Sequence, residues 1–323
     1  MIAFNPQTSN ICAQNQATMS LPLLIVGTVA FDSIETPFGK VDRVVGGAGT
    51  YAALAASAFT RPIGLVSVIG DDFPGETLTM MQERGIDTTG IQQLAGKESF
   101  FWSGRYHLDM NGRDSLETRL NVLADFDPVL PQGFRSPRLL LLGNLTPSVQ
   151  GKVLDQMDRR PELIAMDTMN FWMDSAWDSL LEVIARVDLL TINDEEARQL
   201  SGERSLLKAA RRIAKLGPRY LVIKKGEHGA LFFGEDEIFF APALPLEEVC
   251  DPTGAGDSFA GGLMGYLASR PTLNTEAIKQ GILCGSAMAS CTVEAFGTSS
   301  LEAVTEAVLQ DRLRAFDRMT RIG

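Results

Sequence analysis

The sequence predicts a three-layer α/β fold, with a mostly parallel central sheet flanked by helices and a small β-sheet lid at its edge. Short, nearly continuous apolar runs bounded by turn residues recur along the chain, which is typical of strands buried on both faces. Helix-like segments alternate with these runs, and the alternation implies right-handed crossovers and parallel pairing. Two polar, aromatic, strand-like stretches, at about 34–46 and 97–122, break the alternation and predict the lid.

The order of the elements follows from the same patterns. The stretch 229–243 has two apolar arms around a polar turn, which predicts an antiparallel hairpin. Within the lid, Asn111-Gly112 predicts the turn of another hairpin. We expect strands at 23–29, 63–70, 138–144, 162–167, 187–193 and 219–224, and helices at 47–58, 74–84, 147–158, 177–186, 194–200 and 204–215.

The length and the cysteine pattern indicate one domain in a reducing compartment. No repeat or linker divides the 323 residues, so we expect a single domain over 21–323. Residues 1–20 are polar and lack the apolar core of a secretory signal, which predicts a disordered extension. The longest early apolar run is far shorter than the ~20 residues of a membrane span. Four cysteines without a CxxC pair, and two separated histidines, argue against structural zinc and favour a cytoplasmic protein.

The formal net charge of −11 argues against nucleic acid as a partner, since a phosphate-backbone binder needs a basic face. Arginines do gather near the C-terminus, and we interpret them as the solvated face of a last helix. They are Arg312, Arg314, Arg318 and Arg321.

The stretch "CDPTGAGDSFAGG" carries the clearest chemistry. Gly254 and Gly256 free the backbone so that N–H groups converge at a helix N-terminus, where unpaired donors and the helix dipole favour an anion. Asp257 can cap that helix, or it can act as a base beside a bound phosphate. The residues alone leave both interpretations open. A dinucleotide GxGxxG motif is excluded because Phe259 stands at the third glycine, and no GxxxxGK[ST] occurs.

"DPTGAGDSFAGG" closely resembles the C-terminal signature of the ribokinase-like, or PfkB, carbohydrate kinase family, and the resemblance extends from about residue 22 to 300. The resemblance implies a ribokinase-like fold and an ATP- and Mg²⁺-dependent kinase. It also implies that Asp257 is the general base and that the amides of Gly254, Ala255 and Gly256 form an anion hole. In parts of the family a monovalent cation such as K⁺ activates the enzyme, and here it would use backbone near Asp251, Thr253 and Gly297.

Further motifs occur in the family's order. "VGTVAFD" implies that Asp32 binds substrate hydroxyls, and "GGAGTYAALAAS" resembles the glycine pair and helix that approach the sugar. "NDEEA" resembles the motif that positions Mg²⁺ through water, although a capping box would explain its spacing equally well. The implied substrate ligands are Asp32, Gly46, Gly47, Gly49 and Tyr51; those of the nucleotide are Asn193, Lys225, Gly226, Gly229 and Thr253; the metal ligand is Glu196.

Two departures from the family pattern concern the acceptor. Tyr51 stands where many sugar kinases carry Asn, and "DTMNFW" lacks the arginine of the family's D-x-N-x-R. We expect phosphoryl transfer to a primary alcohol of a sugar or polyol. The alternatives are a nucleoside kinase using aromatic residues such as Tyr51, Phe101 or Trp102 for stacking, a phosphosugar kinase using Arg105, Arg113 and Arg119, and a non-catalytic sugar-sensing relative. The resemblance also implies a homodimer formed through the lid, and no membrane partner.

Overall fold

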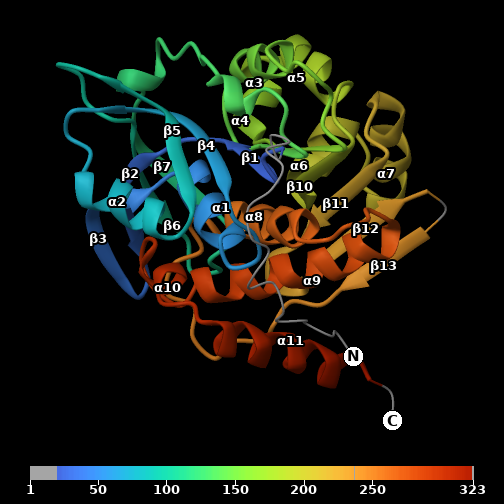
Figure 1. The fold of residues 1–323 in the computed structure, drawn as a ribbon. Coiled ribbons are helices and arrows are strands. Elements are labelled where there is room, and N and C mark those ends of the chain that lie inside the picture. The colour runs from blue at the N-terminus through green and yellow to red at the C-terminus, as the bar shows by residue number, and fades with distance from the viewer. Residues whose placement is uncertain (1–19, 236, 322–323) are drawn as a thin grey trace, which may run out of the picture.

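The computed structural model describes residues 20–235 and 237–321, so the extension expected at 1–20 lies almost wholly outside the described residues. A nine-stranded sheet forms the centre of the molecule (Figure 1). Its strands are β1 (Leu23–Val26), β4 (Ile63–Gly70), β5 (Ile86–Leu94), β8 (Leu139–Leu142), β9 (Leu163–Asp167), β10 (Leu189–Asn193), β11 (Tyr220–Lys224), β12 (Ala230–Gly234) and β13 (Glu237–Ala241). They lie in the order β13-β12-β11-β10-β9-β8-β1-β4-β5. All neighbours pair in parallel except β11 with β12 and β12 with β13, which are antiparallel; β12 and β13 form the predicted hairpin.

Both faces of the sheet are buried, which explains the continuous apolar strands. Leu23 and Ile25 belong to one core, while Leu24 and Val26 belong to the other, because successive side chains of a strand point to opposite faces. Helices cover each core, as Figure 1 shows. The first core is covered by α1 (Ala48–Ala56), α2 (Gly75–Glu83), α8 (Ala255–Ala268), α9 (Thr275–Thr292), α10 (Ser299–Glu302) and α11 (Glu306–Thr320), and the second by α3 (Pro147–Asp155), α4 (Asn170–Ser175), α5 (Trp177–Ile184), α6 (Asp194–Ser201) and α7 (Leu206–Ile213).

A separate four-stranded sheet lies beside the first strands of the chain, at the left of Figure 1. Its two central strands pair in parallel and its outer strands are antiparallel to them. It consists of β2 (Ala30–Thr36), β3 (Gly39–Gly46), β6 (Phe101–Tyr106) and β7 (Arg113–Arg119), in the order β3-β2-β6-β7. The small sheet is therefore present as predicted, and its first strand begins at Ala30, earlier than the sequence indicated.

Two local expectations were wrong. The first strand ends at Val26 instead of residue 29, because Gly27 comes too close to Gly49 for the sheet to continue: a Cβ on Gly27 would lie 2.6 Å from the Gly49 nitrogen. The two-residue turn at Asn111-Gly112 is a longer loop between β6 and β7, in which the Asp109 carboxylate accepts both of their N–H groups. Strand β5 and helix α4 were not predicted.

The packing of α8 on α1 fixes the centre of the molecule. All nine residues of α1 are buried, and glycines of α8 let the two backbones approach closely. A Cβ on Gly261 would lie 2.2 Å from the Ala52 oxygen, and a Cβ on Gly265 would lie 2.6 Å from the Ala56 Cα. The N-termini of both helices are thereby held near each other at the carboxyl side of the sheet.

The remaining expectations about composition can be placed on this fold. Cys284 and Cys291 are both buried in the first core. The C-terminal arginines lie on or just after α11, and Arg312 pairs with Glu294 at 2.5 Å. None of the helices in the described part of the chain is long and apolar enough to cross a membrane.

Candidate active site

The glycine turn before α8 forms a tight N-terminal cradle. Gly254 is the N-cap residue and has φ of +76°, and a Cβ there would lie 2.4 Å from ring atoms of Tyr51. Only glycine fits such a position. The first-turn N–H groups of α8 have no acceptor within the helix, although that of Ala255 donates to the Pro252 oxygen at 3.2 Å. Gly254 and Gly256 are therefore the freer donors of the three predicted amides.

Asp257 lies in the first turn of α8, beside this cradle. Its pKa is raised to about 7, chiefly by burial and then by the negative charge of Asp167. Lys224 and Arg113 act in the opposite direction. A carboxyl group whose pKa lies near neutrality is suited to proton transfer.

Three neighbouring parallel strands bring a charged cluster to the same edge of the sheet. Asp167 ends β9, Asn193 ends β10 and Lys224 ends β11, with Asn193 directly opposite Lys224 in the register. The Lys224 Nζ donates to the Asp167 Oδ2 at 2.6 Å, and both side chains are largely buried. Burial alone would lower the pKa of Lys224, but Asp167, Glu196 and Asp257 raise it overall. Lys224 is therefore a cation shared by three carboxylates.

Sequence reasoning selected Lys225 and missed Lys224. The missed signal is the strand alternation: Tyr220, Val222 and Lys224 share one face of β11, whereas Lys225 lies beyond the strand end. The Lys225 backbone N–H instead donates to the Gly229 oxygen at 2.8 Å, which closes the loop that contains Gly226. A Cβ on Gly226 would meet Asn111 of the small sheet at 2.8 Å, so this loop contacts the β6–β7 connection.

Asn193 and Glu196 form the capping box that the spacing allowed. The Asn193 N–H donates to Glu196 Oε2 at 2.7 Å, and the Glu196 N–H donates to Asn193 Oδ1 at 2.8 Å. Glu196 is 6% exposed, and its pKa is raised to about 7 by burial, against the lowering effect of Lys224. The structure thus shows the capping role of Glu196. Its predicted metal role would come in addition to this one.

Asp32 faces the cleft from the small sheet instead of from the end of the first strand. It is the third residue of β2, buried beneath Gly46, where a Cβ would lie 1.9 Å from the Asp32 Oδ2. The pKa of Asp32 is raised to about 7, chiefly by burial and also by Asp251 and Asp257, while the Gly47 N–H lowers it. The glycine at position 46 therefore makes room for the Asp32 carboxylate.

Gly47 and Gly49 allow the tight turn between β3 and α1. Gly47 has φ of +94°, and a Cβ on it would lie 2.5 Å from the Thr28 oxygen. The Gly49 N–H donates to the same oxygen at 2.8 Å. Gly47 and Gly49 are needed because the backbone of residue 28 passes too close to leave room for a side chain. The same contacts hold Gly46 over Asp32.

Tyr51 is buried at the base of the cradle with a hydroxyl that has no hydrogen-bond partner among the described residues. Burial raises its pKa well above the usual value, and the nearby carboxylates Asp32, Asp251 and Asp257 add to that shift. A buried hydroxyl without a partner is costly. Its ring packs on Gly254 and its hydroxyl lies in the field of the site's carboxylates.

The small sheet contacts the cradle directly. Thr253 Oγ1 donates to the Tyr106 hydroxyl at 3.2 Å, which joins β6 to the glycine turn. Asp251 accepts hydrogen bonds from the Thr253 N–H at 2.8 Å and from the Gly297 N–H at 3.3 Å. The loop around Gly297 and the segment 251–253 are thus brought together, as a monovalent-cation site would require.

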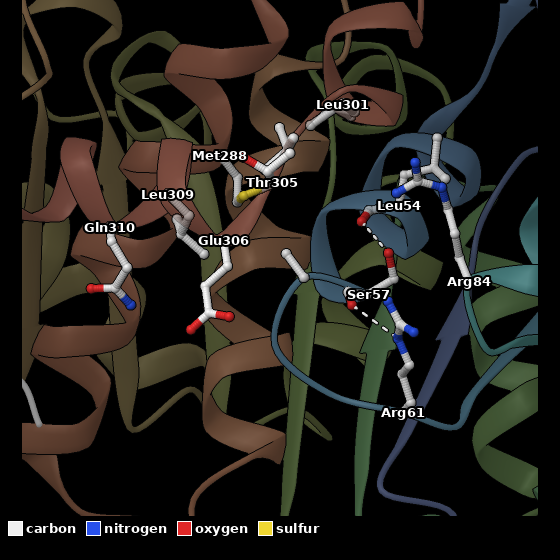
Figure 2. A pocket seen from close by; sticks show the side chains of 12 residues that line it. Leu54, Ser57, Arg61, Arg84, Met288, Leu301, Thr305, Glu306, Leu309 and Gln310 are labelled. Atoms are coloured by element: carbon white, nitrogen blue, oxygen red, sulfur yellow. Dashed lines mark hydrogen bonds between the residues drawn. The ribbon is translucent and has the colours of Figure 1, made fainter. Parts of the chain in front are cut away.

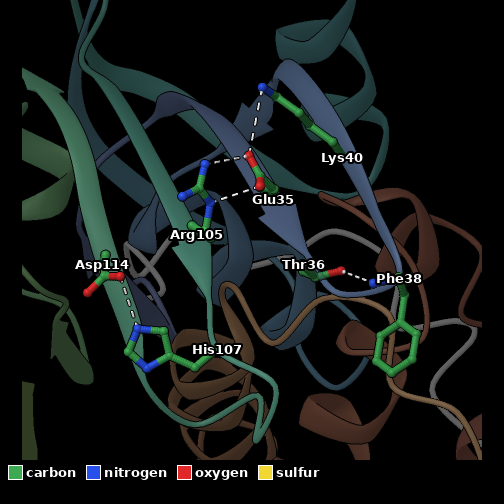
Figure 3. Close-up of polar contacts among 7 residues, drawn as sticks. All are labelled: Glu35, Thr36, Phe38, Lys40, Arg105, His107 and Asp114. Carbon is green, nitrogen blue, oxygen red and sulfur yellow. Dashed lines mark hydrogen bonds and ion pairs between the residues drawn. The ribbon is translucent and has the colours of Figure 1, made fainter.

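Two of the three small-sheet arginines named above as candidates form ion pairs, and Figure 3 shows the pair of Arg105 with Glu35. Arg105 binds Glu35 with a 2.8 Å contact, and Arg119 binds Glu117 at 2.7 Å. Arg113 forms no ion pair with another described residue, and its charge lowers the pKa of Asp32, Glu196 and Asp257. Figure 3 also shows His107 turned to Asp114, within the small sheet.

The site fits a metal-bound nucleotide better than a metal alone. Within residues 20–235 and 237–321, no three His, Cys, Asp or Glu side chains are grouped as a metal cluster. Glu196, Asp167 and Asp257 nevertheless place negative charge beside a cradle of N–H donors. Mg²⁺ usually keeps several waters and binds through one or two carboxylates together with substrate phosphates, so the donor set fits Mg²⁺ that arrives with a nucleotide.

A family model described as "pfkB family carbohydrate kinase" matches residues 25–304. The chain belongs to this family. It is 31% identical to the cytidine kinase of Thermococcus kodakarensis over 256 residues, which covers 78% of this chain and 90% of the relative. This chain is therefore an ATP-dependent kinase of the carbohydrate or nucleoside type.

Solved structures agree on the fold. The nucleoside kinase of Methanocaldococcus jannaschii, described as an archaeal member of the ribokinase family, superposes with a TM-score of 0.72 at 19% identity and covers 91% of this chain and 99% of its own. An Escherichia coli chain described as a ribokinase II, in complex with ATP and Mg²⁺, gives a TM-score of 0.75 at 17% identity, covering 93% and 100%. The ribokinase-like fold predicted from the sequence is thus confirmed.

Proposed function

We propose that this kinase transfers the terminal phosphoryl group of ATP to a primary hydroxyl of a sugar-containing acceptor, with Asp257 as the general base. The observation that carries the proposal is the position of Asp257 directly after the glycine turn, with a pKa raised to about 7 by burial and by Asp167. A base with such a pKa is ionised near neutral pH and still binds a proton well. Asp257 would take the proton of the acceptor hydroxyl as that oxygen attacks.

The glycine turn would stabilise the charge that develops during transfer. The N–H groups of Gly254 and Gly256 point from the start of α8, and that of Ala255 would join them by giving up the Pro252 oxygen. In comparable oxyanion sites each such donor is worth about 3–4 kcal/mol. Because the turn is held by its contact with Tyr51, the Gly254 and Gly256 donors need no reorganisation when charge appears.

Lys224 would make the phosphate side of the site able to accept a negatively charged polyphosphate. It already offsets Asp167, Glu196 and Asp257, which would otherwise repel a polyphosphate. ATP supplies the phosphoryl group, and Mg²⁺ offsets its charge when bound. Glu196 and Asn193 would orient the metal's waters, and Gly226, Gly229, Lys225 and Thr253 would line the nucleotide side. The small sheet, joined to the cradle through Tyr106, would act as a lid that excludes water.

Asp32 would fix the acceptor. Its buried carboxylate belongs to the lid, close enough to Asp257 for the Asp257 charge to raise the pKa of Asp32. Hydrogen bonds from two acceptor hydroxyls to Asp32 would present a third hydroxyl to Asp257. The unpartnered Tyr51 hydroxyl is placed to bond the same acceptor.

A nucleoside is the acceptor class that we favour over a free sugar or polyol. The support is the 31% identity with a cytidine kinase and the exposure of the aromatic residues. Tyr51 and Phe101 are buried, whereas Trp102 of β6 is partly exposed on the lid and can stack on a base. A phosphosugar is less favoured, because Arg105 and Arg119 are already paired.

An ADP-release screen with Mg²⁺-ATP tests this assignment against nucleosides, sugars, polyols and phosphosugars. We expect a nucleoside to give the largest kcat/KM. Trp102→Ala should then raise the KM for the nucleoside about tenfold, as expected for the loss of a base–aromatic stack, and leave that for its free sugar unchanged. If a free sugar gives the largest kcat/KM and Trp102→Ala changes no KM, the acceptor is a sugar and the nucleoside proposal is wrong.

A further inference from the structure

A cavity lies between the end of α1 and the start of α11 (Figure 2). Its volume is about 240 Å³, below the roughly 300–1,000 Å³ of pockets for drug-sized ligands, so it suits a small molecule. Its floor is apolar and fully buried, formed by Leu54, Met288, Leu301 and Leu309.

Two arginines, Arg61 and Arg84, line the same side of this cavity, as Figure 2 shows. Arg61 donates from Nε to the Ser57 oxygen at 3.4 Å, and Arg84 donates to the Glu302 backbone oxygen. The Arg61 side chain lies over Gly85, where a Cβ would approach it to 2.9 Å, so the two arginines are held on adjacent backbone. Neither arginine forms an ion pair with a carboxylate in the described part of the chain.

Two arginines that line one wall without a carboxylate partner among the described residues stand out in a chain of net charge −11. Like charges repel, and an acidic protein offers many carboxylates that could have paired with them. Arginine presents planar, paired donors that match phosphate and carboxylate groups. The arrangement therefore indicates an anion that is supplied from outside the chain.

The opposite wall has a different character. Glu306 and Gln310 lie side by side across the cavity from Ser57 in Figure 2. Glu306 forms no ion pair with Arg61 or Arg84, so the cavity keeps a positive wall and a separate acceptor wall. A ligand that fits both carries an anionic group at one end and hydroxyl donors at the other.

We propose that this cavity is an effector site for a small phosphorylated polyol, with the phosphate on Arg61 and Arg84 and the hydroxyls donating to Glu306. The floor residue Leu54 and the wall residue Ser57 lie near the end of α1, whose other end carries Gly47 and Gly49 at the acceptor side of the cleft. Since α1 is buried along its whole length, a ligand that shifts its end also shifts the glycines that hold Asp32.

Calorimetric titration with glycerol 3-phosphate tests the site, with the cleft saturated by Mg²⁺ and a non-hydrolysable ATP analogue. Arg61→Gln and Arg84→Gln should each weaken binding about tenfold or more, as loss of a charged hydrogen bond predicts. Arg159→Gln, which changes an exposed arginine outside the cavity, is the matched control and should leave the affinity unchanged. Glycerol itself should not bind.

Glu306→Gln tests the contribution of the acceptor wall separately from that of the two arginines. It should tighten binding of inorganic phosphate, because a negative charge is removed, and reduce the preference for glycerol 3-phosphate over inorganic phosphate. In steady-state assays, glycerol 3-phosphate should change the acceptor KM of the wild type and of Arg159→Gln, and not that of Arg61→Gln or Arg84→Gln. Equal affinity in all variants would overturn the site, and binding without a change of KM would overturn its effector role.

Discussion

At the scale of single residues, the site is a set of buried carboxyls held near neutrality. Asp32, Glu196 and Asp257 each have a pKa raised to about 7, with burial as the largest cause. Lys224 is the cation that opposes this shift for Glu196 and Asp257. Arg113 opposes the shift for all three carboxyls. The chemistry of the site is therefore a balance between burial and two nearby positive charges.

The first prediction concerns pH. Because the base must be ionised, and burial has raised its pKa, kcat/KM should fall about tenfold per pH unit below about pH 7 and level off above it. The apparent pKa belongs to the coupled carboxyls together. A pH–rate profile of kcat/KM from pH 5 to 9 measures it. A profile that stays flat down to pH 5 would contradict the raised pKa of the base.

The second prediction compares two adjacent lysines. Lys224→Met removes the charge that lowers the pKa of Asp257, so the acidic limb of the pH–rate profile should move upward by about one unit, as expected for losing a near cation. Lys225→Met is the matched control and should leave that limb in place. If Lys224→Met fails to fold because Asp167 is left buried without a partner, the double variant with Asp167→Asn is compared with Asp167→Asn alone, because Asp167 itself raises the pKa of Asp257. If only Lys225→Met moves the acidic limb to higher pH, then Lys225, and not Lys224, is the cation that lowers the pKa of Asp257.

At the scale of elements, the contact between α1 and α8 positions the site. Gly261→Ala places a methyl group against the Ala52 backbone oxygen, with a built distance of 2.2 Å. Backbone cannot move aside as a side chain can, so we expect a loss of unfolding free energy of about 1–3 kcal/mol. Gly75→Ala, at a helical glycine with nothing within 4 Å, should be neutral or slightly stabilising. Chemical denaturation measures both, and equal effects would contradict the packing argument.

The elements also show what sequence could and could not predict. Strands buried on both faces were predicted because every position is apolar, as in β4 and β8. Strand β5 was missed because it is an edge strand with polar exposed positions. The place of Asp32 was misjudged because the chain leaves the central sheet at Gly27, a change caused by the distant Gly49. Local pattern carries no information about such an encounter.

The candidate site was predicted unevenly for the same reason. Asp257 and its glycines lie in one continuous motif, so the sequence already grouped them. The Lys224–Asp167 pair joins residues 57 positions apart, and only the register of β9, β10 and β11 brings them together. Arg113 could be told from Arg105 and Arg119 only once the partners of those two were known.

At the scale of the whole molecule, the outer face of the small sheet predicts a second copy of the chain as a partner. Every residue of β7 is exposed, and Leu116 is 51% exposed on this edge strand. Phe38, Leu108 and Leu120 of the same sheet are also exposed. An unpaired edge strand with apolar side chains favours association.

The resulting prediction is a dimer of the 35.0 kDa chain that Leu116→Glu converts to a monomer. Light scattering coupled to size exclusion measures the mass. Leu207→Glu, at a similarly exposed leucine on α7, is the matched control and should leave the mass unchanged. A wild-type protein that elutes as a monomer at all concentrations would rule this interface out.

The central claim is that Asp257 is the base of phosphoryl transfer. Asp257→Asn keeps the size of the side chain and removes the proton acceptor, so kcat should fall about 10²–10⁴-fold, while calorimetry should find acceptor and Mg²⁺-ATP bound as before. The decisive measurement is single-turnover phosphoryl transfer by Asp257→Asn to the best acceptor of the screen. The account predicts that loss in the rate of the chemical step, and a variant that keeps more than about a tenth of the wild-type rate would contradict it.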